Sequence, residues 1–280
     1  MRKCCNCFIL FRTYILYTFM IIDPVAFRLG LLEIKWYSLS YVLGIVFAYW
    51  YIRKIDKYRV FSKESYESIM SWWVISIILG GRIGYILFYN LDFYIHFPIE
   101  MFKLWNGGMS FHGGLIGIIS GMYIFCRKNK ISILSALDLG ACAVPVGIFF
   151  GRIANFINGE LYGKVTDIKF GMVFPNSGDS FYRHPSQLYE AFFEGFLLFV
   201  IMNSLFFFTN VRASQGMLSA VYCIWYGVVR FFIEFIREPD AQVGYILFNQ
   251  LTMGQLLSVF MVIMGFYFIK LAKMKAKLSM

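Results

Sequence analysis

Charged side chains are scarce in this sequence. Asp, Glu, Lys and Arg make up 15% of its 280 residues, whereas hydrophobic residues make up 59%. This composition is too apolar for a soluble globular protein of this length. The apolar runs are continuous and lack the alternation of a membrane β-barrel, and the chain is long enough for several helical spans of ~20 residues. We therefore predict an all-α integral membrane protein.

The net charge of +10 needs no nucleic-acid partner in such a protein. Basic residues gather in the cytoplasmic loops of membrane proteins and are attracted to anionic lipid. The lipid bilayer is therefore the expected partner, and no nucleic acid is expected.

Cysteine and histidine are too few and too scattered for a disulfide or metal framework. Three of the six cysteines stand alone within apolar runs, where cysteine is usually a small buried hydrophobe. The other three, Cys4, Cys5 and Cys7, lack a second C-x2-C pair. The candidate histidines, His112 and His184, fall on different elements and form no metal-binding motif. We expect no metal and no cofactor.

Seven apolar segments predict seven transmembrane helices. They are expected at residues 36–52, 69–90, 109–126, 131–151, 191–208, 217–236 and 251–270. The polar stretch 152–185, between the fourth and fifth helices, predicts a small periplasmic region. Residues 1–27 are expected to be an N-terminal extension, either an interfacial helix, a signal-like segment or an appendage from a misassigned start. Residues 28–280 are then the membrane domain.

The distribution of Lys and Arg predicts the orientation. The loops after the first, third and fifth spans, together with the tail, hold thirteen basic residues, and the alternate loops hold six. The first set is expected in the cytoplasm, which places the N-terminus outside and the C-terminus inside. Five basic residues within 1–35 lie on the outer side and disagree with this trend.

The sequence GRIANFINGELYG, residues 151–163, follows one of the most apolar runs in the chain. On a helix, Arg152, Asn155 and Gly159 share one face. Such polar groups at the edge of hydrocarbon cost several kcal/mol unless they are paired. One interpretation is a helix end that becomes polar where it meets water. Four polar groups with three glycines favour a functional site.

With the predicted orientation, polar side chains from five or six helices meet in the outer half of the membrane. Alternatives remain for single members: Arg230 and Glu234 can neutralise each other at i, i+4, and His112 can be a hydrogen-bonded interfacial histidine. The set is Tyr37, Arg82, His112, Arg152, Asn155, Glu160, His184, Gln187, Glu190, Glu194, Tyr226, Arg230, Glu234 and Arg237.

Several arginines facing one cavity indicate a phosphate ligand. Guanidinium is always charged and binds phosphate through two parallel hydrogen bonds. In a membrane the available phosphates are lipid headgroups, so a phospholipid-handling site is predicted. A transporter is disfavoured because the sequence shows neither repeats nor broken helices at the midplane.

Five motifs resemble the prolipoprotein diacylglyceryl transferase family of the bacterial inner membrane. They are GGRIGYILFYN, WNGGMSFHGGLIG, GRIANFINGELYG, RHPSQLYE and WYGVVRFFIEFIREPDAQ, and the resemblance runs from about residue 23 to 271. It implies transfer of the diacylglyceryl group of phosphatidylglycerol to the lipobox cysteine of a prolipoprotein, with release of glycerol phosphate. It also implies a multi-pass protein of the inner membrane with its active site in the periplasm-facing half.

The resemblance also implies the site residues. The catalytic set carried over is His112, Arg152, Tyr226 and Arg230, and the substrate-binding set is Tyr37, Arg152, Asn155, Glu160, Gly163 and Glu234. Ala154 stands where many members have glycine, 163–183 is a short version of a variable region, and 1–22 has no family counterpart.

A mechanism follows as a hypothesis. We expect Arg152 and Arg230 to bind the phosphate and hold it as it leaves, and His112 to act as the general base for the thiol or to orient it. Glu160 and Glu234 are expected to orient the arginines. The alternatives are a membrane protein that binds or translocates phospholipid without chemistry and a structural membrane scaffold. A base beside the phosphate site favours the enzyme.

Overall fold

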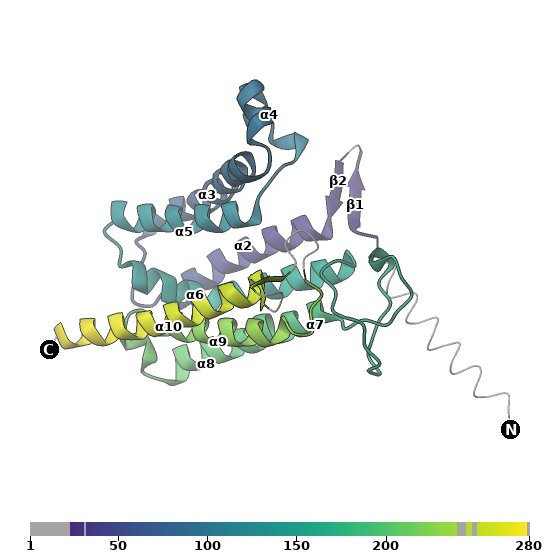
Figure 1. Ribbon diagram of the computed structural model, residues 1–280. Coiled ribbons are helices and arrows are strands. Elements are labelled where there is room, and N and C mark those ends of the chain that lie inside the picture. The colour runs from purple at the N-terminus through teal and green to yellow at the C-terminus, as the bar shows by residue number, and fades with distance from the viewer. Residues whose placement is uncertain (1–22, 31, 240–244, 248–250, 279–280) are drawn as a thin grey trace. The chain divides into compact units, whose positions relative to one another are not determined.

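Figure 1 shows the computed structural model of the chain, which describes residues 23–30, 32–239, 245–247 and 251–278. Most of these residues are helical. The longer helices are α2 (Trp36–Ile55), α3 (Lys63–Tyr89), α5 (Phe111–Lys128), α6 (Ile133–Ile157), α8 (Leu197–Phe208), α9 (Met217–Ile233) and α10 (Met253–Leu278). Short helices are α4 (Leu91–His96) and α7 (Ser186–Glu190), with single turns η1 (Pro98–Phe102), η2 (Leu104–Asn106), η3 (Pro175–Ser177) and η5 (Val211–Ala213), and a π-helical turn η4 (Ala191–Phe196).

Each of the seven apolar segments forms a helix, as predicted. Among the described residues, four helices are long and apolar enough to cross a membrane: Lys63–Tyr89, Ile133–Ile157, Ser186–Phe208 and Met253–Lys275. Helix α9 is apolar but shorter. The structure therefore agrees with an all-α membrane protein, and the number of seven spans and their orientation stay predictions.

Two short antiparallel hairpins precede helices and were not predicted. Strand β1 (Val25–Leu29) pairs with β2 (Leu32–Lys35) immediately before α2, and β3 (Tyr245–Leu247) pairs with β4 (Leu251–Thr252) before α10. The boundary expected at residue 27 falls within β1 and stays a prediction. Of the expected extension, residues 1–22 lie outside the described residues.

The chain divides into two units, a larger one of Met1–Ile52 with Gly140–Met280 and a smaller one of Arg53–Leu139. In the larger unit α9 and α10 pack along each other (Figure 1). Glycines permit this approach: a Cβ atom at Gly227 would lie 2.7 Å from the Ser258 carbonyl oxygen, and one at Gly265 would lie 2.9 Å from that of Ala220. Small residues at a helix contact are typical of packing within membranes.

A buried asparagine connects three helices of the larger unit. Asn203 on α8 accepts a hydrogen bond of 2.5 Å from the Tyr51 hydroxyl, and its amide donates to the Cys142 carbonyl at 3.1 Å. The same amide donates to the Phe199 carbonyl at 2.8 Å. Because these three hydrogen bonds lie within the protein, the burial of the amide group among apolar helices is compensated.

The fifth apolar segment is a helix with a π-helical turn inserted between α7 and α8. The turn is close to α6, since a Cβ atom at Gly195 would lie 2.7 Å from Cβ of Phe149. The indole of Trp225 on α9 donates to the Phe193 carbonyl at 3.1 Å. Turns of this kind often occur at functional sites, and this one carries Glu194 and directly follows Glu190.

In the smaller unit, α3 and α5 pack through glycines. A Cβ atom at Gly117 would lie 2.2 Å from the Ser76 carbonyl oxygen, whereas one at Gly114 would lie 3.6 Å from that of Ile77. Ser110 caps α5, because its hydroxyl accepts from the Gly113 amide at 3.2 Å.

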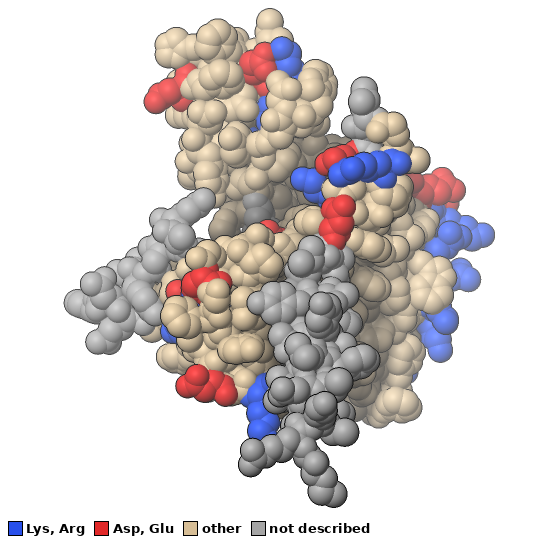
Figure 2. Space-filling model, turned by 90° about the vertical axis from the view of Figure 1, so that its right-hand side faces the viewer, with Lys and Arg blue, Asp and Glu red and all other residues tan. Residues whose placement is uncertain are grey.

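The exterior is largely uncharged. Figure 2 shows one face, on which Lys, Arg, Asp and Glu form small groups separated by surface of other residues. Exposed large apolar side chains include Phe88 and Phe208, at 79% and 86% of full exposure. An apolar exterior of this kind suits contact with lipid.

We predict that Gly117→Ala destabilises the smaller unit, since the new methyl group meets backbone atoms. Overpacking of this kind costs about 1–3 kcal/mol, which lowers the midpoint of thermal unfolding in detergent. Gly114→Ala is the matched control on the same helix, with an equal gain in helix propensity and only ordinary contacts. Equal midpoints for the two variants would contradict the described packing.

Candidate active site

Two carboxylates lie fully buried at the junction of α7 and the π turn. Glu190 and Glu194 have 0% exposed surface. A buried carboxylate is costly unless a charged or hydrogen-bonding partner compensates for its lost hydration. Arg152 on α6 and Arg230 on α9 are such partners, so the two carboxylates lie where charged groups of these helices meet.

Arg152, near the end of α6, pairs with both carboxylates. Its Nε lies 2.9 Å from Oε2 of Glu190, as an ion pair without hydrogen-bond alignment, and its Nη2 donates to Oε2 of Glu194 at 3.3 Å. These contacts use one edge of the guanidinium. Within the described part of the chain, the Nη1 atom takes part in no hydrogen bond or ion pair, and the side chain is 16% exposed.

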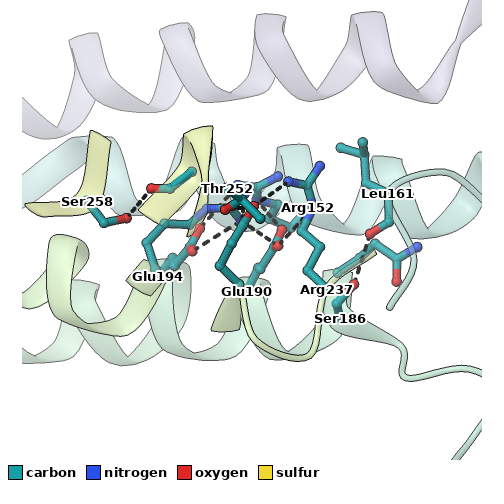
Figure 3. A network of polar contacts seen from close by, with 12 residues as sticks. Arg152, Leu161, Ser186, Glu190, Glu194, Arg237, Thr252 and Ser258 are labelled. Carbon is teal, nitrogen blue, oxygen red and sulfur yellow. Dashed lines mark hydrogen bonds and ion pairs between the residues drawn. The ribbon is translucent and has the colours of Figure 1, made fainter. Parts of the chain in front are cut away.

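Arg230 on α9 approaches the same carboxylates from another helix. Its Nη1 donates to Oε1 of Glu190 at 2.6 Å and lies 3.8 Å from Oε1 of Glu194. Its Nη2 lies 2.9 Å from Oε2 of Glu234, one turn along α9. The i, i+4 pair inferred from the sequence is therefore present, but Arg230 also bonds across helices. Figure 3 shows Arg152, Glu190 and Glu194 converging in this cluster.

A second layer surrounds Glu234. Arg237 lies 3.7 Å from Oε1 of Glu234 and 3.8 Å from Oε1 of Glu190. The Thr252 hydroxyl donates to Oε1 of Glu234 at 3.0 Å, and the backbone N–H of Gln255 donates to the Thr252 hydroxyl at 3.2 Å. Glu234 thus meets the N-terminus of α10, where the helix dipole favours a negative charge.

The formal charges of this cluster balance. Arg152, Arg230 and Arg237 contribute three positive charges, and Glu190, Glu194 and Glu234 contribute three negative ones. Arg152 and Arg230 nevertheless keep exposed surface, 16% and 11% of their side chains. Guanidiniums that keep some exposed surface have the chemistry to bind an anion such as phosphate.

Asn155 and Glu160 form a separate group just beyond the cluster. The Glu160 carboxylate accepts from the Asn155 amide at 2.8 Å and from the Asn158 amide at 3.2 Å. Glu160 was expected to orient the arginines, and the structure gives that position to Glu190 and Glu194. The physical reason is that the turn after α6 directs Glu160 back toward Asn155, in the last turn of α6, and toward Asn158, just beyond the end of that helix.

Gly163 lies between two stretches of backbone. Its amide donates to the His184 carbonyl at 2.8 Å, and the next residue, Lys164, donates to the Ile236 carbonyl at 2.8 Å. A Cβ atom at Gly163 would lie 2.6 Å from Cβ of His184 and 2.7 Å from the Ile236 oxygen. The glycine is therefore required by packing, and contact with substrate stays a prediction.

The segment between α6 and α7 is held in place by Arg183. Its guanidinium donates to Asp179 at 2.7 Å and to Glu238 at 3.1 Å, and stacks over the Tyr162 ring. The hydrogen bond from Arg183 lowers the pKa of Asp179. Burial lowers the pKa of the neighbouring His184, so this histidine is neutral at pH 7.

The two predicted tyrosines are placed differently. Tyr226 precedes Arg230 by one turn of α9, and its ring stacks on Tyr222 at 6.1 Å between centroids. The Tyr37 hydroxyl lies 3.1 Å from that of Tyr41 on α2. Their roles toward a substrate stay predictions.

Arg82 does not belong to a phosphate site. In the smaller unit its guanidinium donates to five carbonyl oxygens, those of Glu100, Met101, Lys103, Gly107 and Gly108, at 2.5–3.2 Å. It also lies over the Tyr94 ring. The expectation that Arg82 joins the other arginines is therefore corrected: this side chain holds the loop between α4 and α5.

His112 also belongs to the smaller unit. It is exposed and is the second residue of α5. Its role as general base stays a prediction.

Glu190 and Glu194 are among the polar residues predicted to converge, but their pairing with the arginines was not predicted. Their spacing, i and i+4 on one apolar helix, contained a usable signal. Two like charges on one face of a membrane helix repel each other and require cations from other helices. Arg152 and Arg230 are the arginines whose predicted depth in the membrane is closest to that of the two glutamates.

Comparison with known proteins gives a consistent result. A family model described as prolipoprotein diacylglyceryl transferase matches residues 24–271. Three relatives carry the name phosphatidylglycerol–prolipoprotein diacylglyceryl transferase. The Ehrlichia canis protein is 80% identical over 260 residues, 93% of this chain and 100% of its own. That of Wolbachia pipientis wMel is 56% identical over 88% of this chain and 93% of its own. That of Anaplasma marginale is 50% identical over 91% of this chain and 90% of its own.

We predict that Arg82→Lys loosens the loop between α4 and α5. A lysine keeps the charge but cannot reach five carbonyl groups, so several hydrogen bonds of about 0.5–1.5 kcal/mol each are lost. Backbone amides of residues 98–108 should then exchange with solvent deuterium roughly tenfold faster or more. Arg127→Lys, at an exposed position on α5, is the control. Unchanged exchange in Arg82→Lys would show that the loop does not depend on this arginine.

Proposed function

The chain belongs to the prolipoprotein diacylglyceryl transferase family, and we propose that it transfers the diacylglyceryl group of phosphatidylglycerol to a cysteine thiol of prolipoproteins. The acceptor cysteine is that of the lipobox, and glycerol phosphate is released. This is the first step of bacterial lipoprotein maturation.

The observation that carries the proposal is the pair Arg152 and Arg230. Two helices bring these guanidiniums to a shared buried carboxylate, at 2.9 and 2.6 Å, while part of each side chain stays exposed. A lipid phosphate fits this arrangement, because guanidinium binds phosphate through two parallel hydrogen bonds. Burial among apolar helices strengthens the attraction, since little water screens the charges.

The reaction is a displacement at carbon. The sulfur of the acceptor thiolate forms a bond to the terminal glycerol carbon of the diacylglyceryl group, and the bond from that carbon to the phosphate oxygen breaks. The phosphate oxygen keeps the electron pair and leaves as part of glycerol phosphate. The thiol proton goes to the base, His112. These steps balance without a redox partner, and the proposal assigns no cofactor or metal.

The arginines have the larger task in this scheme. A thiol has a reference pKa of about 8.5, so forming the thiolate at neutral pH costs only ~2 kcal/mol. Expelling a phosphate ester from carbon is harder, because negative charge develops on the leaving oxygen. Arg152 and Arg230 stabilise that charge as it appears.

The remaining family residues are assigned to substrate binding. Tyr226 stands beside Arg230 and donates a hydrogen bond to the reacting phosphate. Tyr37, Asn155, Glu160 and Gly163 shape the surroundings of the headgroup, and Glu234 holds Arg230 in place. The last assignment is supported by the 2.9 Å distance between Glu234 and Arg230.

We place the protein in the bacterial inner membrane. Seven helices span it, with the N-terminus outside, the C-terminus in the cytoplasm and the site in the periplasm-facing half. The excess of basic residues in the alternate loops supports this orientation. The acyl chains reach the site sideways from the bilayer, through a gap between helices.

The function is tested with purified protein, phosphatidylglycerol and a lipobox peptide, by measuring the mass of the peptide. A gain of one diacylglyceryl group that is absent when the peptide cysteine is replaced by serine confirms the transfer. Movement or binding of lipid without a gain in peptide mass would instead favour a protein that binds or translocates phospholipid without chemistry.

We predict that Arg152→Lys slows transfer despite the retained charge. The planar fork is lost, and removal of one preorganised donor to a developing negative charge typically costs about 10²–10³-fold in rate. The measurement is the initial rate of peptide mass gain, with Arg127→Lys as the control. Near-normal transfer by Arg152→Lys would contradict bidentate phosphate binding.

A further inference from the structure

Glu190 contacts both arginines of the site. Its Oε2 lies 2.9 Å from Nε of Arg152, and its Oε1 accepts from Nη1 of Arg230 at 2.6 Å. The two arginines come from α6 and α9, whereas Glu190 ends α7. One carboxylate on a third helix therefore fixes the spacing between the two guanidiniums.

The other two carboxylates of the cluster, Glu194 and Glu234, do not contact both arginines as closely as Glu190 does. Glu194 lies 3.3 Å from Arg152 and 3.8 Å from Arg230. Glu234 pairs with Arg230 at i, i+4 and with Arg237, but not with Arg152, so it does not set the spacing between Arg152 and Arg230. Among the described carboxylates, Glu190 alone lies within 3 Å of both arginines.

Glu190 is more deeply buried than the two arginines. It has no exposed surface, whereas the arginine side chains keep 16% and 11% of theirs. It pairs with Arg152 through Nε, which leaves Nη1 of that guanidinium for a ligand. A residue in this position does not touch a phosphate, and its effect on the reaction passes through the arginines.

Hydrogen bonds hold the backbone on both sides of Glu190 in place. The Ser186 hydroxyl donates to the Leu161 carbonyl at 2.9 Å, and the Gln187 amide donates to the Glu160 carbonyl at 2.6 Å (Figure 3 shows the Ser186–Leu161 contact). On the other side, the π turn is fixed by Trp225 through the Phe193 carbonyl. The carboxylate is therefore held at a defined place before any ligand arrives.

We propose that Glu190 is a positioning residue, which sets Arg152 and Arg230 at the spacing that fits the leaving phosphate. The proposal rests on the transferase function given above. The negative charge of Glu190 also offsets that of the arginines, so the site holds the headgroup of the bound lipid only loosely. The spacing of the two arginines matters most as negative charge develops on the leaving phosphate, because only binding that is stronger in the transition state accelerates the reaction.

The test compares catalysis with headgroup binding in Glu190→Gln. Gln has the shape of Glu but no charge, so the arginines lose their common partner while the site becomes more positive. We expect kcat for diacylglyceryl transfer to fall about 100-fold, as for a misplacement of about 1 Å. The affinity for glycerol phosphate, measured by calorimetry, should equal or exceed that of the wild-type protein.

Two further variants separate positioning from folding. Glu190→Asp keeps the charge and is one methylene group shorter, so it should recover part of kcat. Glu194→Gln, equally buried and one turn further on, should lower kcat less than Glu190→Gln, because its contacts with the arginines are longer. A merely structural role would lower kcat and glycerol phosphate affinity together, with no recovery in Glu190→Asp.

Each outcome decides the proposal. Loss of kcat with retained headgroup affinity supports it. Transfer by Glu190→Gln within threefold of wild type overturns it, and so does a parallel loss of kcat and affinity that Glu190→Asp does not relieve. If the wild-type protein itself transfers nothing to the peptide, the proposed function fails. The role of Glu190 is then judged by whether the glycerol phosphate affinity that Arg152→Ala abolishes survives in Glu190→Gln.

Discussion

The cost of burying ionised groups among apolar helices governs the larger unit of this protein. Glu190 and Glu194 have lost all contact with solvent, and a carboxylate in such surroundings must be paired or lose its charge. The cations that pair with them come from α6, α9 and the segment after α9. The ion pairs therefore fix these elements at one level, and the site exists because they meet there.

Close backbone packing makes these ion pairs possible. Gly195 lets the π turn lie against Phe149 of α6, next to the turn that holds Arg152. Gly254 leaves room for the Glu234 carboxylate at the start of α10, since a Cβ atom there would lie 2.6 Å from it. A larger residue at either position would separate a charged group from its partner. The small residues and the charges thus form one arrangement.

The helices could be predicted from the sequence because their signal is local. Continuous apolar runs between polar loops gave all seven helical segments, and family motifs indicated Arg152 and Arg230. The π turn gives no comparable signal, because the hydrogen bonds of a π turn leave no pattern in hydrophobicity. Neither hairpin was predicted, since each strand is at most five residues long.

The choice of partners could not be predicted from spacing alone. Glu160 follows Arg152 closely in sequence, yet its carboxylate bonds to Asn155 and Asn158, and the carboxylates that pair with Arg152 lie about forty residues away. Arg82 was placed with the other arginines by its depth, but backbone carbonyls 18–26 residues further along the chain take its donors. In both cases the deciding contact comes from a loop conformation that hydrophobic periodicity does not encode.

A double-mutant cycle between Arg152 and Glu190 tests the central claim most directly. The free energy of unfolding in detergent would be measured for the wild-type protein, Arg152→Gln, Glu190→Gln and the double variant. If the two groups compensate each other's burial, each single change leaves the buried cluster with one uncompensated charge, and the double variant is less destabilised than the sum of the two. We expect a coupling of about 1–3 kcal/mol. Effects that add to within ~0.5 kcal/mol would show that the two side chains do not pair, and would contradict the account.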